Sequence, residues 1–253
     1  MNSAWQGFFD ELARWRDAGR TIEFWWRDDD AARPGQSLER LTALAHATST
    51  PLALAVIPLQ AEKAVFEGSG PLISVLQHGT DHINRAGPRE KKTEFSLVEA
   101  PAAALARLAA ARTRLAALAG KRLLRVLAPP WNRLPRQLAP HLAAAGWRGL
   151  SQFGARASTE AAPGLRQINT HVDIIAWRSN RGFAGETEVL AAAVRHLAAK
   201  RAAAADAGEA TGWLTHHAIH DEAAWVFLER LFETTRNHPA AAWRRAEELF
   251  HAS

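Results

Sequence analysis

The chain contains no cysteine and no long apolar run, and both absences narrow what the protein can be. Without cysteine it can form no disulfide and can use no thiolate chemistry. No apolar run reaches the roughly 18 residues that a membrane-spanning helix needs. Residues 1–6 contain neither a basic segment nor an apolar one, so they do not resemble a secretory signal. We therefore expect a cytoplasmic protein with no membrane partner.

A basic tract is also missing, although positive charge is in slight excess. The chain has 31 lysine and arginine residues against 26 aspartate and glutamate residues, for a net charge of +5. The basic residues form short pairs, at 121–122, 200–201 and 244–245. Solvated helix faces explain such pairs better than a nucleic-acid site does. We therefore expect no nucleic-acid partner.

Strand-like and helix-like segments alternate along the chain. The segments with strand character are 21–27, 52–57, 72–76, 123–127, 149–153, 167–177 and 212–217. The segments with helical character are 3–18, 38–47, 60–66, 101–119, 136–145, 186–204, 221–235 and 239–251. This alternation predicts βα units with a parallel sheet.

About seven strands in 253 residues suit a barrel better than a flat sheet. We therefore predict the α/β class and a single (β/α) barrel, specifically a distorted seven-stranded (β/α)7 barrel. Residues 1–253 are expected to form one domain, with helix 3–18 before the barrel and helices within 221–251 packed on it. The polar stretch 84–96 is expected to be an exposed loop.

Polar residues of the types that catalyse reactions or bind metals follow several of the predicted strands. Three aspartates at 28–30 end the first strand, and His78 ends the third. A Pro-Pro-Trp turn at 129–131 ends the fourth, and two histidines at 216–217 end the last. In a parallel α/β barrel the carboxyl ends of the strands share one face, where active sites lie. The sequence therefore predicts one cleft built from four separate segments.

The first two of these segments have the residue types of a metal site. Adjacent carboxylates repel one another, and a buried unpaired carboxylate is costly, so the Asp28–Asp30 cluster favours a cation. Alternatively, the cluster is a solvated turn in which one aspartate caps the next helix. His78 and His82 are four residues apart, a spacing that lets two imidazoles reach one metal. Two histidines and a carboxylate fit zinc, and they are also compatible with cobalt, nickel or iron.

The order of these motifs resembles the polysaccharide deacetylase family, also called the NodB-homology family. The family's Thr-Phe-Asp-Asp-Gly motif is similar to Arg-Asp-Asp-Asp-Ala at 27–31. Its His-Ser/Thr-x-x-His motif is similar to His-Gly-Thr-Asp-His at 78–82. Its last three motifs are similar to Ala-Pro-Pro-Trp-Asn at 128–132, Asp-Ile-Ile-Ala-Trp at 173–177 and Leu-Thr-His-His at 214–217. The resemblance spans residues 21 to about 220.

The resemblance implies a role for each motif. It implies that Asp29 is the catalytic base and that the metal ligands are Asp30, His78 and His82. The extra Asp28 leaves this register open by one residue. His216 is the implied general acid, and His217 is the alternative, because neighbouring residues on a strand face opposite sides.

The implied substrate-binding residues are Trp131, Asp173 and Trp177. Asp173 is expected either to orient His216 or to meet the substrate. Trp131 and Trp177, together with Trp213, are candidates for an apolar wall against a sugar ring. Packing in the protein core is the alternative for each tryptophan.

Two positions depart from the family's pattern. Ala128 stands where the family usually has arginine, and Ala176 stands where it often has a second aspartate. The usual arginine contact that orients the base is then missing, unless Arg27 or Arg125 replaces it. These departures affect the expected substrate more than the expected metal site.

By this resemblance, the protein is a hydrolase of non-peptide C–N bonds. It would remove an acyl group, acetyl above all, from an amide nitrogen of a sugar or glycan, with zinc as the expected divalent metal. Its partner would be an N-acylated sugar or another small amide. One alternative is a related hydrolase of a small non-polymeric amide, which a cytoplasmic location favours. The other is a non-catalytic carbohydrate-binding relative, which the departures at Ala128 and Ala176 favour.

Overall fold

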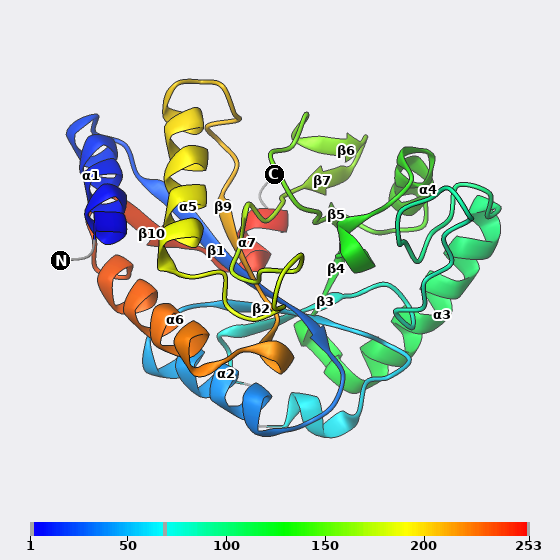
Figure 1. Ribbon diagram of the computed structural model, residues 1–253. Coiled ribbons are helices and arrows are strands. Elements are labelled where there is room, and N and C mark those ends of the chain that lie inside the picture. Colours follow the sequence, from blue (N-terminus) through cyan, green and yellow to red (C-terminus); the bar gives the residue numbers. More distant parts are fainter. Residues whose placement is uncertain (1–2, 68–69, 252–253) are drawn as a thin grey trace.

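The structure is a computed structural model that describes residues 3–67 and 70–251 (Figure 1). Its centre is a sheet formed by β1 (Ile22–Ala31), β2 (Leu52–Val56), β3 (Ile73–Gln77), β4 (Leu123–Leu127), β5 (Gly149–Leu150), β6 (Glu160–Ala162), β7 (Leu165–Gln167), β8 (Val172–Asp173), β9 (Thr211–Thr215) and β10 (Ala241–Trp243). The strand order is β6-β7-β5-β4-β3-β2-β1-β9-β8, and β10 pairs with β1. Among these strands, every pairing is parallel except that of β6 with β7.

The stretch 165–173, which contains both β7 and β8, closes the sheet into a barrel. On one side, the backbone N–H of Ile168 donates to the carbonyl of Leu150 in β5 (3.1 Å). On the other side, the N–H of His171 donates to the carbonyl of Gly212 in β9 (2.7 Å). This stretch therefore acts as the seventh barrel strand, together with β1 to β5 and β9. The predicted distorted seven-stranded barrel is confirmed.

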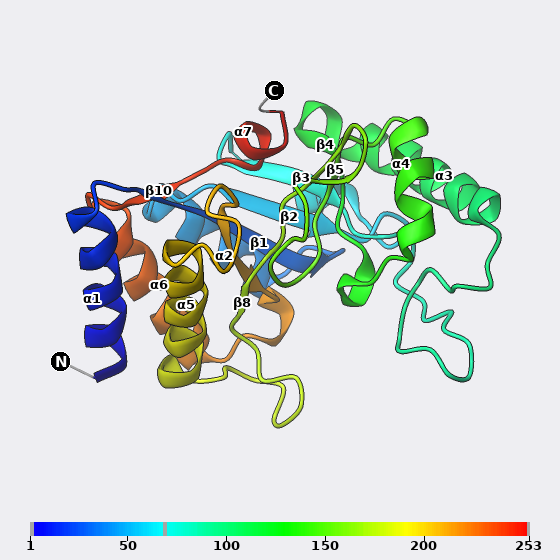
Figure 2. The same ribbon diagram turned by 90° about the horizontal axis from the view of Figure 1, so that it is seen from above.

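Helices cover the outside of the curled sheet, as Figures 1 and 2 show. They are α1 (Ser3–Asp17), α2 (Gln36–Ala47), α3 (Pro101–Ala119), α4 (Ala139–Ala144), α5 (Glu186–Arg201) and α6 (Glu222–Thr235). The last helix, α7 (Ala246–His251), instead packs against the inner face of the sheet. In α1, four large apolar residues at helical spacing are buried: Trp5, Phe8, Leu12 and Trp15. Asp221 caps α6, because its carboxylate accepts a hydrogen bond from the N–H of Ala224 (2.9 Å). Within the described residues, no helix combines the length and hydropathy needed to cross a membrane.

Side chains alternate along β1 between two layers of core. Phe24 and Trp26 belong to the outer cluster, between the sheet and the helices. Trp25 belongs to the inner cluster, where it meets Phe250 of α7 edge to face at 5.9 Å. Successive residues of a strand point to opposite faces. Arg27 and Asp29 therefore lie on the same face of β1 as Trp25, whereas Asp28 lies on the same face as Trp26. This alternation decides what each aspartate of the cluster contacts.

The predicted helix at 239–251 is wrong. Residues 241–243 instead form β10, and only 246–251 are helical. β1 begins at Ile22, four residues before its pairing with β2 begins at Trp26. Residues 22–24 therefore have an edge that β2 does not cover, and β10 pairs with that edge. The predicted strands 149–153 and 167–177 are likewise too long, because regular pairing ends at 150 and 173. The first strand is longer than predicted and carries the aspartates to Ala31.

Candidate metal centre

Three side chains meet at the carboxyl end of the sheet. Asp30 lies near the end of β1, and His78 and His82 lie in the segment that follows β3. The Oδ1 atom of Asp30 is 3.1 Å from Nε2 of His78 and 3.2 Å from Nε2 of His82. The side chain of His78 is 2% exposed, whereas those of His82 and Asp30 are 24% and 34% exposed. The cluster is therefore anchored in the barrel and open to solvent on one side.

The backbone at this cluster is unusual. Asp30 has a φ of 71° and His82 has a φ of 59°, both in the left-handed region that residues with a side chain rarely adopt. Such strain is found at functional sites, where the surrounding structure holds it in place. Gly79 has a φ of 60°, and a Cβ atom there would collide with the carboxylate of Glu94 and the ring of Pro130. The segment between the two histidines therefore requires glycine.

Glu94 holds the histidine segment in this conformation. Its buried carboxylate accepts hydrogen bonds from the N–H groups of Thr80 (2.7 Å) and His82 (3.1 Å), and from the hydroxyl of Thr80. Burial raises the pKa of Glu94, and these hydrogen bonds offset only part of that effect. The expectation of an exposed loop at 84–96 is therefore wrong for 93–96, which are buried.

Arg27 holds the carboxylate of Asp29. Its Nε atom lies 2.8 Å from Oδ1 of Asp29, and its Nη2 atom donates to Oδ2 at 2.9 Å. Both side chains are buried. The same guanidinium donates to Oδ1 of Asn132 (2.6 Å) and to the hydroxyl of Ser151 (2.6 Å). Of the two candidates to replace the arginine missing at position 128, the structure thus brings Arg27 to Asp29, while Arg125 is exposed.

Asp28 points to the opposite side of β1 and has its own partners. Its carboxylate accepts hydrogen bonds from the hydroxyl of Thr215 (2.6 Å) and the N–H of His217 (2.9 Å). It also lies 2.5 Å from Nδ1 of His217. Burial by itself raises the pKa of Asp28, but the charge and hydrogen bond of His217 outweigh it and lower the pKa overall. Asp28 and His217 therefore form a closed buried pair, apart from the Asp30 cluster.

His216 is left without such a pair. Its ring packs edge to face against Trp177, with centroids 4.6 Å apart, and its buried Nδ1 atom has no hydrogen-bond partner within the described residues. The carboxylate of Asp173 accepts from the indole N–H of Trp177 (2.7 Å) and from the N–H of Ile175 (2.9 Å). Asp173 thus positions Trp177, which in turn packs against His216.

The charges of these groups act on one another. Burial raises the pKa of Asp30, but the contacts with His78 and His82 and the positive charges of His78 and His216 lower it overall, well below its usual range. Burial also raises the pKa of Asp173, and the nearby charge of His216 offsets part of that rise. His216 therefore lies within electrostatic range of both the Asp30 cluster and Asp173.

The predicted aromatic wall is only partly present at this face. Trp131 packs against His82 with ring centroids 4.5 Å apart, and Trp177 is 38% exposed. Trp213 is fully buried and packs edge to face with Phe8 and Phe24, so it belongs to the core.

Solved structures share this architecture, although no protein-family model and no curated protein matches the sequence. A protein from Mycobacterium smegmatis assigned as a polysaccharide deacetylase matches with a TM-score of 0.64 at 15% identity, over 92% of this chain and 90% of that one. A peptidoglycan deacetylase from Bacillus subtilis matches with a TM-score of 0.54 at 11% identity, over 91% and 89%. A family 4 carbohydrate esterase from Streptomyces lividans, in complex with acetate, matches with a TM-score of 0.52 at 12% identity, over 85% and 87%.

The chain has the polysaccharide deacetylase fold. The resemblance found in the sequence motifs is thereby confirmed at the level of fold. Within this polysaccharide deacetylase fold, the segments 27–31, 78–82, 128–132 and 214–217 all reach the carboxyl end of the barrel, as predicted. The segment 173–177 reaches it through Trp177 and Asp173.

Sequence reasoning missed three residues that build the site. Glu94 holds the histidine segment, and Asn132 and Ser151 hold Arg27. Glu94 gave no signal, because it lies in an irregular loop without periodicity. Ser151 and Asn132 each follow a strand end, where polar residues of this polysaccharide deacetylase fold gather, so their position was a usable signal.

Proposed function

We propose that the protein is a metal-dependent hydrolase that removes an acyl group, acetyl above all, from an amide nitrogen of a sugar. The observation that carries the proposal is that two groups of residues lie together at the carboxyl end of the barrel. One is the Asp30–His78–His82 cluster, and the other is the neighbouring Asp29, fixed by Arg27. The shared fold of deacetylases and esterases supports the same activity.

The donor set fits a divalent metal, with zinc as the first candidate. One ligand atom from each of Asp30, His78 and His82 lies within 4.8 Å of the others. The buried Oδ1 atom of Asp30 accepts no hydrogen bond from the described residues, although two ring nitrogens face it at 3.1 and 3.2 Å. Three ligands of this type leave positions open for water and substrate. When bound there, the ion would polarise the acyl carbonyl and acidify a water molecule.

In the proposed reaction, Asp29 is the general base. A water oxygen attacks the acyl carbon, and Asp29 takes the proton that the water loses. The double contact with Arg27 fixes the orientation of the carboxylate. The partners of Arg27 at Asn132 and Ser151 fix the guanidinium in turn.

His216 is the proposed general acid. The C–N bond breaks to give a carboxylic acid and an amine, and the departing nitrogen takes a proton from His216. His216 is free for this role because its Nδ1 atom has no hydrogen-bond partner among the described residues, whereas His217 is held by Asp28. Trp131 and Trp177 flank the cluster and offer apolar faces to a sugar ring.

The first experiment is the metal content per chain of protein purified without a chelator or a histidine tag. We expect close to one divalent ion per chain in the wild type and in His216→Ala, and none in His78→Ala/His82→Ala. The second experiment is release of acetate from chitotetraose and from small acetamides, with Asp29→Asn as the inactive control. Stoichiometric metal in the double variant would refute the ligand assignment. Sugar binding without acetate release, unchanged by Asp29→Asn, would instead indicate a non-catalytic relative.

A further inference from the structure

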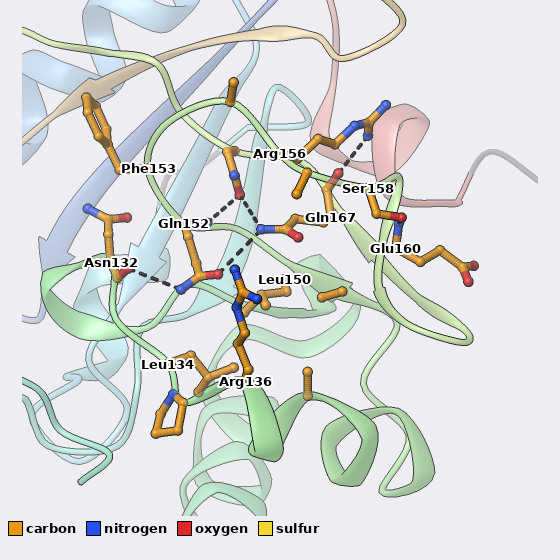
Figure 3. A pocket seen from close by; sticks show the side chains of 16 residues that line it. Asn132, Leu134, Arg136, Leu150, Gln152, Phe153, Arg156, Ser158, Glu160 and Gln167 are labelled. Atoms are coloured by element: carbon orange, nitrogen blue, oxygen red, sulfur yellow. Dashed lines mark hydrogen bonds between the residues drawn. The ribbon is translucent and has the colours of Figure 1, made fainter. Parts of the chain in front are cut away.

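A cavity of about 390 Å³ opens beside the proposed base, between the ends of β5 and β7 and the helical turn η4 (Arg136–Leu138) (Figure 3). Its lining includes Asn132, Arg136, Gln152, Phe153, Gln167 and Asn169. Asn132 belongs to both places, because its Oδ1 atom accepts from the guanidinium that holds Asp29 (2.6 Å). A molecule in the cavity therefore lies next to the catalytic machinery.

Side-chain amides form a connected network on the cavity wall. Nε2 of Gln152 donates to the backbone carbonyl of Asn132 (3.2 Å), and N–H of Gln152 donates to Oδ1 of Asn169 (2.9 Å). Nε2 of Gln167 lies 3.4 Å from Oε1 of Gln152 and 3.3 Å from Oδ1 of Asn169. Figure 3 shows the side chains of Gln152 and Gln167 close to each other in the wall. Phe153, which is 47% exposed, adds an apolar face of the kind that packs on a sugar ring.

Arg136 is a cation of this cavity that forms no ion pair with the described residues. Figure 3 shows its guanidinium pointing into the cavity, and no carboxylate in the described part of the chain pairs with it. Arg156, the other cation of the wall, is neutralised by Asp206 at 2.7 Å. Glu160 points away from the cavity in Figure 3 and accepts from the N–H of Gly164 (3.3 Å). The positive charge of Arg136 therefore faces the cavity, and Glu160 is the one carboxylate among the described residues of its lining.

A second cavity, of about 410 Å³, continues from the first and has the same sign of charge. The two share Asn132, Leu134, Pro135 and Gln152 in their walls. The second adds three cations, Arg89, Lys91 and Arg133, and one acid, Glu90. The carboxylate of Glu90 is occupied by the hydroxyl of Ser96 (2.7 Å) and the N–H of Leu97 (2.9 Å). A negatively charged chain could therefore lie along both cavities.

We propose that this cavity binds the anionic group of an N-acylated saccharide, a carboxylate or phosphate on the N-acylated sugar or on the sugar next to it. Arg136 binds the anion, the amides of Gln152 and Gln167 bind ring hydroxyls, and Phe153 packs on the ring. The substrate class is then an acidic N-acylated saccharide and not a neutral one. This inference rests on the proposed function for the hydrolysis, but the binding itself can be measured without turnover.

The test compares three probes by calorimetry on the full chain. They are a hyaluronan tetrasaccharide, which alternates glucuronate with N-acetylglucosamine, neutral chitotetraose, and N-acetylglucosamine 6-phosphate. We expect the wild type to bind at least one charged probe about tenfold more tightly than chitotetraose, because a charge-assisted contact contributes about that factor. Arg136→Gln should remove this preference, and added salt should weaken it. The matched control is Arg195→Gln, an exposed arginine on α5 outside the cavity, which should keep the preference.

The outcomes separate this inference from the proposed function. Preference for the tetrasaccharide assigns the anion as a carboxylate, and preference for the monosaccharide assigns it as a phosphate. Equal affinity for charged and neutral probes, or a preference that survives Arg136→Gln, overturns the inference even if acetate is released. Absence of acetate release from every probe, with an Arg136-dependent preference retained, overturns the proposed function and leaves the anion site standing.

Discussion

Arg27 and Asp29 lie two residues apart on β1, and the guanidinium contacts both oxygens of the carboxylate, at 2.8 and 2.9 Å. Residues two apart on a strand share a face, so the same short segment supplies the proposed base and the group that orients it. The family's third motif usually has an arginine where this chain has Ala128. That arginine is therefore not needed for this contact. The pair is buried, so its two charges depend on each other.

Arg27→Gln is expected to destabilise the protein by about 3 kcal/mol, because it leaves the carboxylate of Asp29 buried without its counter-charge. We also expect a fall in kcat of about a hundredfold or more, because the base loses its orientation. Urea denaturation and acetate release measure the two effects. Arg125→Gln is the control, because Arg125 was the other candidate to replace the arginine missing at position 128, and it is exposed.

The double variant Arg27→Gln/Asp29→Asn separates pairing from a general loss of packing. Removing both charges should restore much of the stability lost in Arg27→Gln, while activity stays absent. A double variant as unstable as the sum of the single variants would show that the two side chains do not interact energetically.

The three-aspartate cluster shows how much of the site could be predicted from the sequence. Its position at a strand end, together with the four-residue spacing of His78 and His82, predicted a metal site there, because strand ends of a parallel barrel share a face. The sequence alone left the register open, since the strand was expected to end at Arg27. The strand continues to Ala31, so alternation sends Asp28 to His217 and Asp29 to Arg27. The role of each aspartate depends on where the strand ends, which is the least predictable part of an element.

Glu94→Gln is expected to weaken metal binding by about ten- to a hundredfold, as is typical when a group that orients metal ligands is changed. Its carboxylate accepts from Thr80 and from the N–H of His82, and an amide would place a donor against these donors. Competition with a chromophoric chelator measures the affinity. Glu90→Gln, in the same loop but hydrogen-bonded to Ser96, should leave the affinity unchanged. Equal losses in both variants would assign the effect to the loop as a whole.

His216→Ala and His217→Ala should fail in different ways. Without His216, kcat should fall by about a hundredfold or more, while metal content and stability stay near wild type. Without His217, the carboxylate of Asp28 loses its buried partner, so stability should fall by about 3 kcal/mol. Acetate release, metal content and urea denaturation on both variants distinguish the roles. A normal kcat in His216→Ala would transfer the acid role to another residue.

Contacts that join distant segments could not be predicted from the sequence, for a different reason. β10 and the cavity beside the base depend on which edges and loops meet after folding, and neither has a local pattern. The short segment 241–243 has too few residues to show a strand period, and it is held by the free edge of β1. Arg136 looks like any other arginine after a proline, and only its place in the cavity sets it apart.

A second group of histidines, the buried His171 and the half-buried His196, predicts how stability depends on pH. His196 on α5 stacks on His171 with ring centroids 3.9 Å apart. Burial, together with the nearby charges of His171 and Lys200, lowers the pKa of His196 to about 3. Between that value and the ordinary 6.5, the unfolded chain binds the proton and the folded chain does not. This contribution to stability is therefore present above pH 6.5 and is lost as the pH falls toward 3.

His196→Gln removes the titrating group, so the variant should lose less stability than the wild type between pH 7 and pH 4. We expect the difference to be roughly 1–3 kcal/mol, because each unit of pKa shift corresponds to about 1.4 kcal/mol. Urea denaturation across this range gives the two curves. His141→Gln, an exposed histidine on α4, is the control and should follow the wild type. Parallel curves for wild type and His196→Gln would mean that the folded chain takes up this proton as readily as the unfolded chain does.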